Sequence, residues 1–289
     1  MGKQQAIIPS LTAFLSLGHS QMSGDEALSM KRVEPTCEKY FGVDYHVHST
    51  FSIDGRSSIG DMCQSALLLG LDEVGFAEHM DFEQEDPGRS NLDYEGYNSA
   101  IDVARETFGN RLTIRKGVEV DYQSRHVKAI EQWLKGRIFD FRIGSVHFVN
   151  GKPIDLGGIT QEALKSLYPA YCKEIILSVK SGLFDLVGHF DLISSFCNIP
   201  IAMKKKYVPS VLETILDSKI HLEVNSRGFR EGRNNTVPNS DILREFFLMG
   251  GKRVSFGSDA HSAETVGSGI RESLALARKL MAKELELPF

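Results

Sequence analysis

The stretch Tyr45-His46-Val47-His48-Ser49, YHVHS, closes an apolar run and places two imidazoles one residue apart. Side chains two positions apart on a strand point to the same face, so His46 and His48 project together if this run is a strand. Such a pair either holds a metal ion or consists of two exposed or hydrogen-bonded histidines. The other seven of the nine histidines decide between these interpretations.

From residue 40 onward, short β-type runs alternate with helical patterns. Strands are predicted at 40–47, 72–77, 111–119, 139–146, 184–188, 220–225 and 253–258. Helices are predicted at Ile59 to Leu69, Tyr94 to Phe108, Arg125 to Leu134, Gln161 to Val179, Pro209 to Asp217, Ser240 to Met249 and Gly269 to Ala282. This alternation implies parallel strands with right-handed crossovers. Seven repeats favour an α/β barrel related to the eightfold TIM kind, although an open doubly wound sheet also fits.

The length of 289 residues suits one large domain. Residues 1–39 lack sustained periodicity and are predicted to be an N-terminal extension with little order. Residues 40–289 are predicted to form a single domain. No low-complexity linker divides that segment.

Composition and net charge indicate which class of molecule the protein binds. The net charge of −5 gives no global reason to bind a polyanion, so a small substrate is favoured over nucleic acid. The four cysteines, Cys37, Cys63, Cys172 and Cys197, form no C-x-x-C pair, which argues against a disulfide framework and a thiolate zinc site and suits a reducing cytoplasm. No apolar run approaches the length of a membrane span, so no membrane partner is expected. The oligomeric state is left open.

Potential metal ligands lie at or just after the ends of six of the seven predicted strands. They are His46 and His48 at the first strand, His79 after the second, Glu119 at the third, His147 at the fourth, His189 at the fifth, and Asp259 and His261 after the seventh. Carboxyl ends of parallel strands share one face of a barrel, so we expect these side chains to converge. Histidine with carboxylate and no thiolate suits zinc, manganese or iron, and more than one ion. His19, His126 and His221 lie elsewhere and are predicted to be structural or exposed.

Four of these segments form an ordered series of motifs: His46-Val47-His48, Glu78-His79, Gly144-Ser145-Val146-His147 and Gly257-Ser258-Asp259-Ala260-His261. The series resembles the polymerase and histidinol phosphatase (PHP) family of metal-dependent phosphoesterases over about residues 42 to 270. Members have a distorted seven-stranded β/α barrel with a trinuclear metal centre. The resemblance therefore implies a PHP-type phosphoesterase domain over 40–289.

The resemblance also implies a ligand set for two or three divalent ions (Zn, Mn or Fe). One ion would be held by His46, His48, Glu119 and Asp259, a second by Asp54, His79 and His261, and a third by Glu119, His147 and His189, with Glu119 bridging. Asp54 stands where other members have histidine. It matches the histidinol-phosphatase branch and favours harder ions. Glu78 and Asp44 are expected to support ligands rather than bind metal.

Three further stretches resemble that branch, residues 148–155, 188–192 and 223–230. The resemblance implies hydrolysis of L-histidinol phosphate to L-histidinol and phosphate, in histidine biosynthesis, by attack of a metal-bridging hydroxide. Arg227 departs from the branch, where a small polar residue is usual, and this leaves the details of the substrate pocket open.

Four residues are predicted to act on the substrate. Arg230 is the first candidate to bind phosphate oxygens, and Arg227 is the second. The alternative is that either one is an exposed arginine without a role in binding. Asp155 would face the ammonium or imidazole of the substrate, or else cap its own loop. Asp191 would protonate the leaving alkoxide or, in the preferred interpretation, orient a neighbour.

Three alternatives accompany this prediction. They are a phosphoesterase of the same family acting on another small phosphate ester or nucleotide, an exonuclease, and a catalytically silent metal scaffold. The absence of a strongly basic run speaks against the exonuclease. The complete set of predicted ligands speaks against the scaffold.

Overall fold

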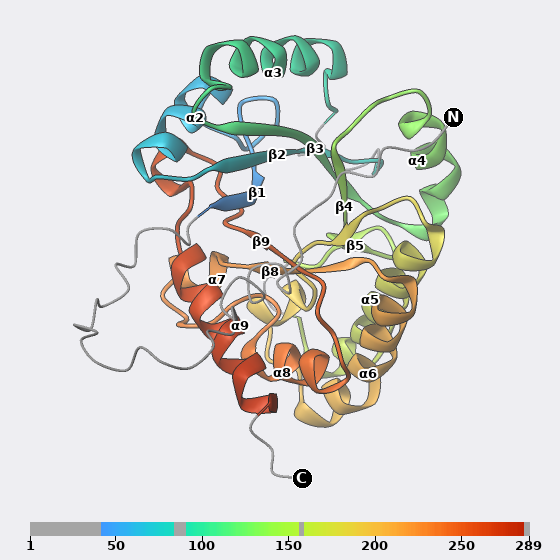
Figure 1. Cartoon of the computed structure of the whole chain (residues 1–289). Helices are drawn as coiled ribbons and strands as arrows, with labels where there is room; N and C mark the ends of the chain where they lie inside the picture. The colour runs from blue at the N-terminus through green and yellow to red at the C-terminus, as the bar shows by residue number, and fades with distance from the viewer. Residues whose placement is uncertain (1–41, 84–90, 156–158, 286–289) are drawn as a thin grey trace, which may run out of the picture.

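Seven parallel strands form the centre of the molecule in the computed structural model, which describes residues 42–83, 91–155 and 159–285. They neighbour one another in chain order: β1 (Val43–Val47), β2 (Glu73–Met80), β3 (Thr113–Asp121), β4 (Phe141–Ser145), β7 (Leu186–Val187), β8 (His221–Asn225) and β9 (Val254–Gly257). The His48 N–H donates to the Ala260 carbonyl with N and O 2.7 Å apart. The Asp259 N–H donates to the His46 carbonyl at the same distance. These bonds join the two edges into a nearly closed barrel, so the predicted barrel is confirmed over the open sheet (Figure 1).

Two strands run further than predicted. β2 continues to Met80 and β3 to Asp121, so His79 and Glu119 lie inside their strands rather than after or at the ends. The reason is the pairing between these strands, which stays in register to its end and sets His79 directly beside Glu119. This register is a tertiary property that propensity cannot reveal.

Helices surround the barrel (Figure 1) and mostly match the predicted ranges. They are α2 (Ile59–Leu68), α3 (Tyr94–Phe108), α4 (Val127–Leu134), α5 (Gln161–Ser181), α6 (Ile201–Ser218), α7 (Arg227–Arg230), α8 (Ser240–Leu248) and α9 (Ile270–Leu285). The elements that the sequence did not predict are α7, the antiparallel hairpin of β5 (Phe148–Val149) and β6 (Lys152–Pro153), and the 3-10 turns η3 (Ser124–His126), η4 (Leu192–Ser195) and η5 (Ala263–Thr265).

The start of α6 was predicted wrongly. It begins at Ile201, and Pro209, which was taken as its first residue, lies inside it. Proline is common in the first turn of a helix because its missing N–H is not needed there, which explains the error. Residues 201–207 are exposed or half-buried, so no apolar stripe marks this half of the helix.

Local signals account for several helix starts. Ser58 and Asp61 form a reciprocal capping box at α2. The side chains of Asp93, Thr160 and Asn239 accept backbone N–H groups at the starts of α3, α5 and α8. These caps satisfy N–H groups that the helix itself leaves unpaired.

The barrel interior holds a small apolar cluster of its own. Its buried members, Tyr45, Ala77, Phe141, Ile143 and Leu186, come only from strands, whereas the large cluster joins strands to helices. On β2, His79 lies two residues beyond Ala77 and therefore shares its face. The candidate site therefore lies at the carboxyl ends of the strands, next to this apolar cluster inside the barrel.

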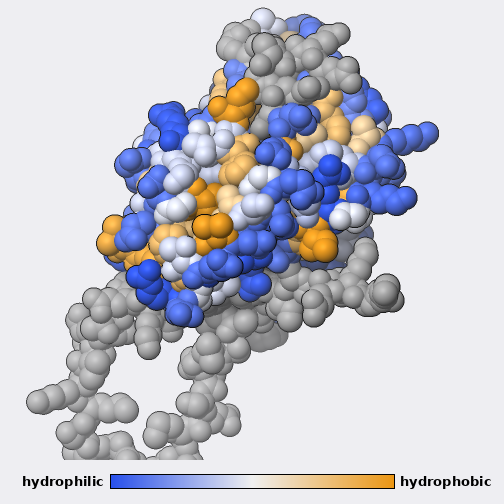
Figure 2. All heavy atoms as spheres, turned by 90° about the horizontal axis from the view of Figure 1, so that it is seen from above, coloured by the Kyte–Doolittle hydropathy of each residue, from blue (hydrophilic) through white to orange (hydrophobic). Residues whose placement is uncertain are grey.

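The face shown in Figure 2 is mostly hydrophilic, with apolar residues in small groups. Among the described residues, no helix has the length and apolar character to cross a membrane. Cys63, Cys172 and Cys197 are free thiols. The predicted extension 1–39, with His19 and Cys37, lies outside the described residues.

Candidate metal centre

All nine predicted ligand residues come together at the carboxyl ends of the strands. His46 lies in β1, one residue before its end, and His48 and Asp54 follow that strand. His79 lies in β2 and Glu119 in β3. His147 and His189 follow β4 and β7, and Asp259 and His261 follow β9. Each is within 4 Å of another member through side-chain atoms. The convergence expected from parallel strand ends is present.

Glu119 is the hub of the cluster and is fully buried. Its Oε2 lies 2.9 Å from His79 Nδ1 and 3.3 Å from His46 Nε2. Its Oε1 lies 2.8 Å from His189 Nε2 and 3.6 Å from His147 Nε2. His48 Nε2 lies 3.6 Å from Oε2 as well. One carboxylate therefore faces five imidazoles, three on Oε2 and two on Oε1, as a bridging ligand requires.

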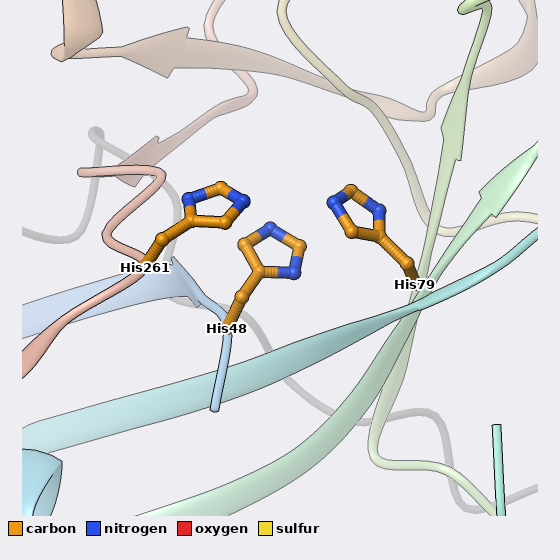
Figure 3. Close-up of side chains that lie close together, drawn as sticks. All are labelled: His48, His79 and His261. Atoms are coloured by element: carbon orange, nitrogen blue, oxygen red, sulfur yellow. The ribbon is translucent and has the colours of Figure 1, made fainter. Parts of the chain in front are cut away.

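A second part of the cluster centres on His48, His79 and His261, whose rings face one another (Figure 3). The ring centroids of His79 and His261 lie 4.1 and 4.4 Å from that of His48. His261 Nε2 lies 3.0 Å from Asp54 Oδ2, and His48 Nε2 lies 3.6 Å from Asp259 Oδ1. Carboxylates thus flank this histidine group on two sides.

Three groups of potential ligands have donor atoms within 4.8 Å of one another: His48, His79 and His261; His46, His48 and Asp259; and His46, Glu119 and His189. They overlap with the three ligand sets that the resemblance implies. His48, which was expected at the first ion, also lies with His79 and His261. His46, which was expected at the same ion, also lies with Glu119 and His189. His147 and Asp54 lie at the margin, and the Asp54 side chain is 54% exposed.

Burial and neighbouring charges set the ionisation of these groups. Burial lowers the pKa of His48 well below its usual range, and the nearby His79 and His261 lower it further. Burial lowers the pKa of His147 to about 3. Burial alone would raise the pKa of Glu119, but the adjacent His46 and His79 more than offset it and hold that pKa well below its usual value. Glu119 outweighs burial at His79 and raises the pKa of this imidazole to about 10. Metal binding needs neutral imidazoles and an ionised carboxylate, so His79 must release its proton when a metal ion binds.

Three buried atoms at the centre of the cluster form no hydrogen bond: His46 Nε2, His48 Nε2 and Glu119 Oε2. Unpaired buried polar atoms are rare because each costs free energy. Glu223 and Glu119 outweigh burial and raise the pKa of His46. A cation would take the place of that proton and satisfy all three atoms, so these residues fit divalent metal ions.

Glu223, for which the sequence predicted no role, accepts hydrogen bonds from two of the candidate ligand residues. Its Oε1 accepts from His46 Nδ1 at 2.6 Å, and its Oε2 accepts the His189 N–H at 2.6 Å. A carboxylate only accepts, so His46 must donate from Nδ1 and present Nε2 to the centre. The pattern Glu223-Val224-Asn225 gave no sign of this contact because it crosses the barrel from β8 to β1 and β7.

Glu223→Gln should lower metal affinity about 10- to 100-fold, the usual effect of losing such a partner. The amide can accept from only one of its two partners and meets the other with an N–H group. Metal affinity is read by competition with a chromogenic chelator, and Glu213→Gln on the exposed face of α6 is the control. Unchanged affinity in Glu223→Gln would show that His46 needs no such support.

Glu78 and Asp44 behave as predicted, since both are buried and engaged by hydrogen bonds away from the ligand atoms. Glu78 accepts from the hydroxyls of Ser49 and Ser52, each at 2.6 Å. Asp44 accepts from the N–H and hydroxyl of Ser258. Each carboxylate therefore fixes a loop that carries candidate ligands.

The cluster opens into a cavity of about 500 Å³. Its lining includes seven of the nine candidate ligands, Arg227, Asp81, Asp155 and the apolar side chains of Ile53, Phe148, Pro153, Ile154, Leu192 and Phe196. Arg227 Nη1 lies 3.7 Å from Asp259 Oδ2. Of the predicted substrate residues, Arg227 and Asp155 therefore face the cavity.

Arg230 and Asp191 do not line this cavity. The Arg230 guanidinium donates to the carbonyls of Ser258 and Asp259 and lines an adjoining cavity. Asp191 is buried and accepts from Tyr168 Oη at 3.0 Å, from Ser194 Oγ at 2.7 Å and from Lys204 Nζ at 2.6 Å. These contacts fit the preferred orienting role of Asp191, two residues after His189.

The chain resembles several proteins over most of its length. It is 28% identical over 255 residues to a histidinol-phosphatase of Lactococcus lactis, covering 84% of this chain and 93% of that one. It is 26% identical over 258 residues to a histidinol-phosphatase of Bacillus subtilis, covering 78% and 95%. A crystal structure of histidinol phosphate phosphatase from Lactococcus lactis, complexed with Zn, L-histidinol and phosphate, matches with a TM-score of 0.69 and 26% identity over 84% of this chain and 93% of that one.

The family model described as PHP domain matches residues 44–227, which is more than half of the chain. That span contains the first three of the four motifs and seven of the nine clustered ligands. The remaining two, Asp259 and His261, join the cluster through the closure of β9 onto β1. The chain therefore belongs to the PHP domain family.

Proposed function

We propose that the chain is a metal-dependent phosphomonoesterase that hydrolyses L-histidinol phosphate to L-histidinol and phosphate. The observation that carries the proposal is the cluster of unpaired, buried ligand atoms around Glu119 at the floor of the cavity. The two curated relatives named histidinol-phosphatase, and the related structure with Zn, L-histidinol and phosphate, support the substrate. The proposed pathway is histidine biosynthesis, and the proposed location is the cytoplasm.

The proposed cofactors are two or three divalent ions, Zn, Mn or Fe, held by the nine clustered residues. When bound, such ions lower the pKa of a water molecule and polarise phosphoryl oxygens. The chain's own part is to fix the ligands before substrate arrives. Glu223 fixes His46 and the backbone of His189, and Asp121 accepts the His147 N–H at 2.7 Å.

Arg227 is the residue we assign to the phosphoryl group. Its side chain is 31% exposed, faces the cavity beside Asp259, and keeps a charge whatever the pH. Arg230 does not line the larger cavity, so we assign the substrate's phosphoryl group to Arg227 rather than to Arg230. Asp191 is assigned to positioning of the loop that follows His189.

The lining of the larger cavity also has groups suited to a cation. It includes Asp81 and Asp155 together with Phe148 and Phe196. Carboxylates and aromatic side chains suit the ammonium and imidazole of histidinol. A lining with both an arginine and carboxylates matches a substrate that carries a phosphate and cationic groups.

A panel of phosphate esters at equal concentration tests the substrate. Histidinol phosphate should have the highest kcat/KM by at least about 100-fold, because buried polar groups discriminate strongly against substrates that leave them unpaired. Sugar phosphates and nucleotides serve as comparisons. Similar kcat/KM values for all of them would replace the proposal with a phosphoesterase of broader specificity.

Asp155→Asn should raise KM for histidinol phosphate about tenfold, the lower range for one charged hydrogen bond near solvent. KM for p-nitrophenyl phosphate should change by no more than about twofold, because this ester has no cationic group that could pair with Asp155. Asp217→Asn on α6 is a matched exposed control. Equal effects on both substrates would assign Asp155 to loop capping.

A further inference from the structure

A second cavity of about 310 Å³ adjoins the metal centre. It is lined by Asp54, Arg56, Arg227, Arg230, His261, Ser262 and Thr265. Asp54, Arg227 and His261 line the larger cavity as well. The two cavities therefore lie side by side and share these three residues.

Positive charge dominates the second cavity. Arg56 comes from the loop after β1, and Arg227 and Arg230 come from α7. The only carboxylate in the lining, Asp54, faces His261 at 3.0 Å and His79 at 3.7 Å, toward the metal centre. Three guanidinium groups around one hollow repel one another, and an anion between them would relieve this repulsion.

The guanidinium groups retain donors for such an anion. Arg230 uses two N–H groups on backbone carbonyls, and Arg227 uses Nε on Glu231, out of five N–H groups on each side chain. The Arg56 side chain makes no hydrogen bond or ion pair with the residues that the structure describes. The hydroxyls of Ser262 and Thr265 lie 3.3 Å apart in the same lining.

We propose that this arginine-lined cavity is an oxyanion subsite that receives the phosphate ion after hydrolysis. The inference rests on the proposed phosphomonoesterase function. Asp81 and Asp155 in the lining of the larger cavity repel phosphate and attract a cationic alcohol, whereas the arginine-lined cavity attracts phosphate. The two products therefore leave the metal centre by different cavities, and the bonds to the Ser258 and Asp259 carbonyls keep Arg230 in place for this task.

Calorimetric titration of the metal-loaded full chain with inorganic phosphate tests the subsite. The wild type should bind two phosphate ions per chain, one at the metal centre and one between the arginines. Arg56→Gln should weaken only the second binding event, by about tenfold or more, the usual cost of one charged hydrogen bond to phosphate. Arg244→Gln, exposed on α8 and lining neither cavity, should leave both events unchanged.

One phosphate per chain in the wild type, or two equal events in Arg56→Gln, would overturn the subsite. The titration needs no turnover, so failure of the proposed substrate is detected separately, by the absence of hydrolysis. A second arm compares glycerol 3-phosphate with 3-phosphoglycerate, which adds a carboxylate. A wild-type preference for the doubly anionic ester that Arg56→Gln removes would assign the cavity to substrate binding and contradict its role in phosphate release.

Discussion

Glu119→Gln is expected to lower kcat/KM for histidinol phosphate about 1,000-fold or more, and to remove most of the bound metal. Glu119 is the buried carboxylate that faces five imidazoles, with at least two near each oxygen. The substitution keeps the shape of the side chain and removes its charge, so the metals lose their shared ligand. Steady-state kinetics and metal content of the purified variant measure the effect.

Glu213→Gln is the matched control, because Glu213 is exposed on α6 and touches no candidate ligand. The melting temperature of Glu119→Gln in chelator should be close to that of the wild type in chelator, since both then lack metal. A variant that keeps its metals and at least a tenth of wild-type activity would refute the bridging role of Glu119.

Chelation should abolish activity reversibly and also destabilise the fold. His46 Nε2, His48 Nε2 and Glu119 Oε2 lose the cation that satisfies them. One ion at 1,000 times its dissociation constant stabilises the folded state by about 4 kcal/mol. For a chain of this size the melting temperature should therefore fall by roughly 10 °C. Calorimetry with and without chelator measures this fall.

Readdition of Zn, Mn or Fe should restore both activity and melting temperature, and the ion that restores most identifies the preferred metal. The His46→Asn variant, which lacks one of the unpaired atoms, should show a smaller chelator effect than the wild type. An unchanged melting temperature together with full activity in chelator would contradict a resident metal centre.

The barrel and its ligand cluster could be predicted because the decisive signals are local. Apolar runs mark the strands, and six of the seven end in or near a predicted metal ligand, as in Val146-His147 and Gly188-His189. Parallel pairing then brings those ends to one face whatever the details of packing. For that reason all nine candidate ligands converge even though the ends of β2 and β3 were placed a few residues too early.

The remaining features depend on contacts that sequence patterns do not encode. Glu223 braces His46 across the barrel, and Arg56 faces a cavity formed with α7. The short helix α7 itself turns Arg230 toward two carbonyls and leaves Arg227 at the metal centre. Only packing decides which of two arginines three residues apart reaches the cavity, so the sequence ranked them in the opposite order.

The metal-to-protein ratio of the full chain, purified without chelator and measured by elemental analysis, tests the central claim most directly. The convergence of side chains from different strands on Glu119 predicts two to three divalent ions per wild-type chain and at most one per Glu119→Gln chain. A wild-type chain that carries no stoichiometric metal, and takes up none when Zn, Mn or Fe is supplied, would contradict the account.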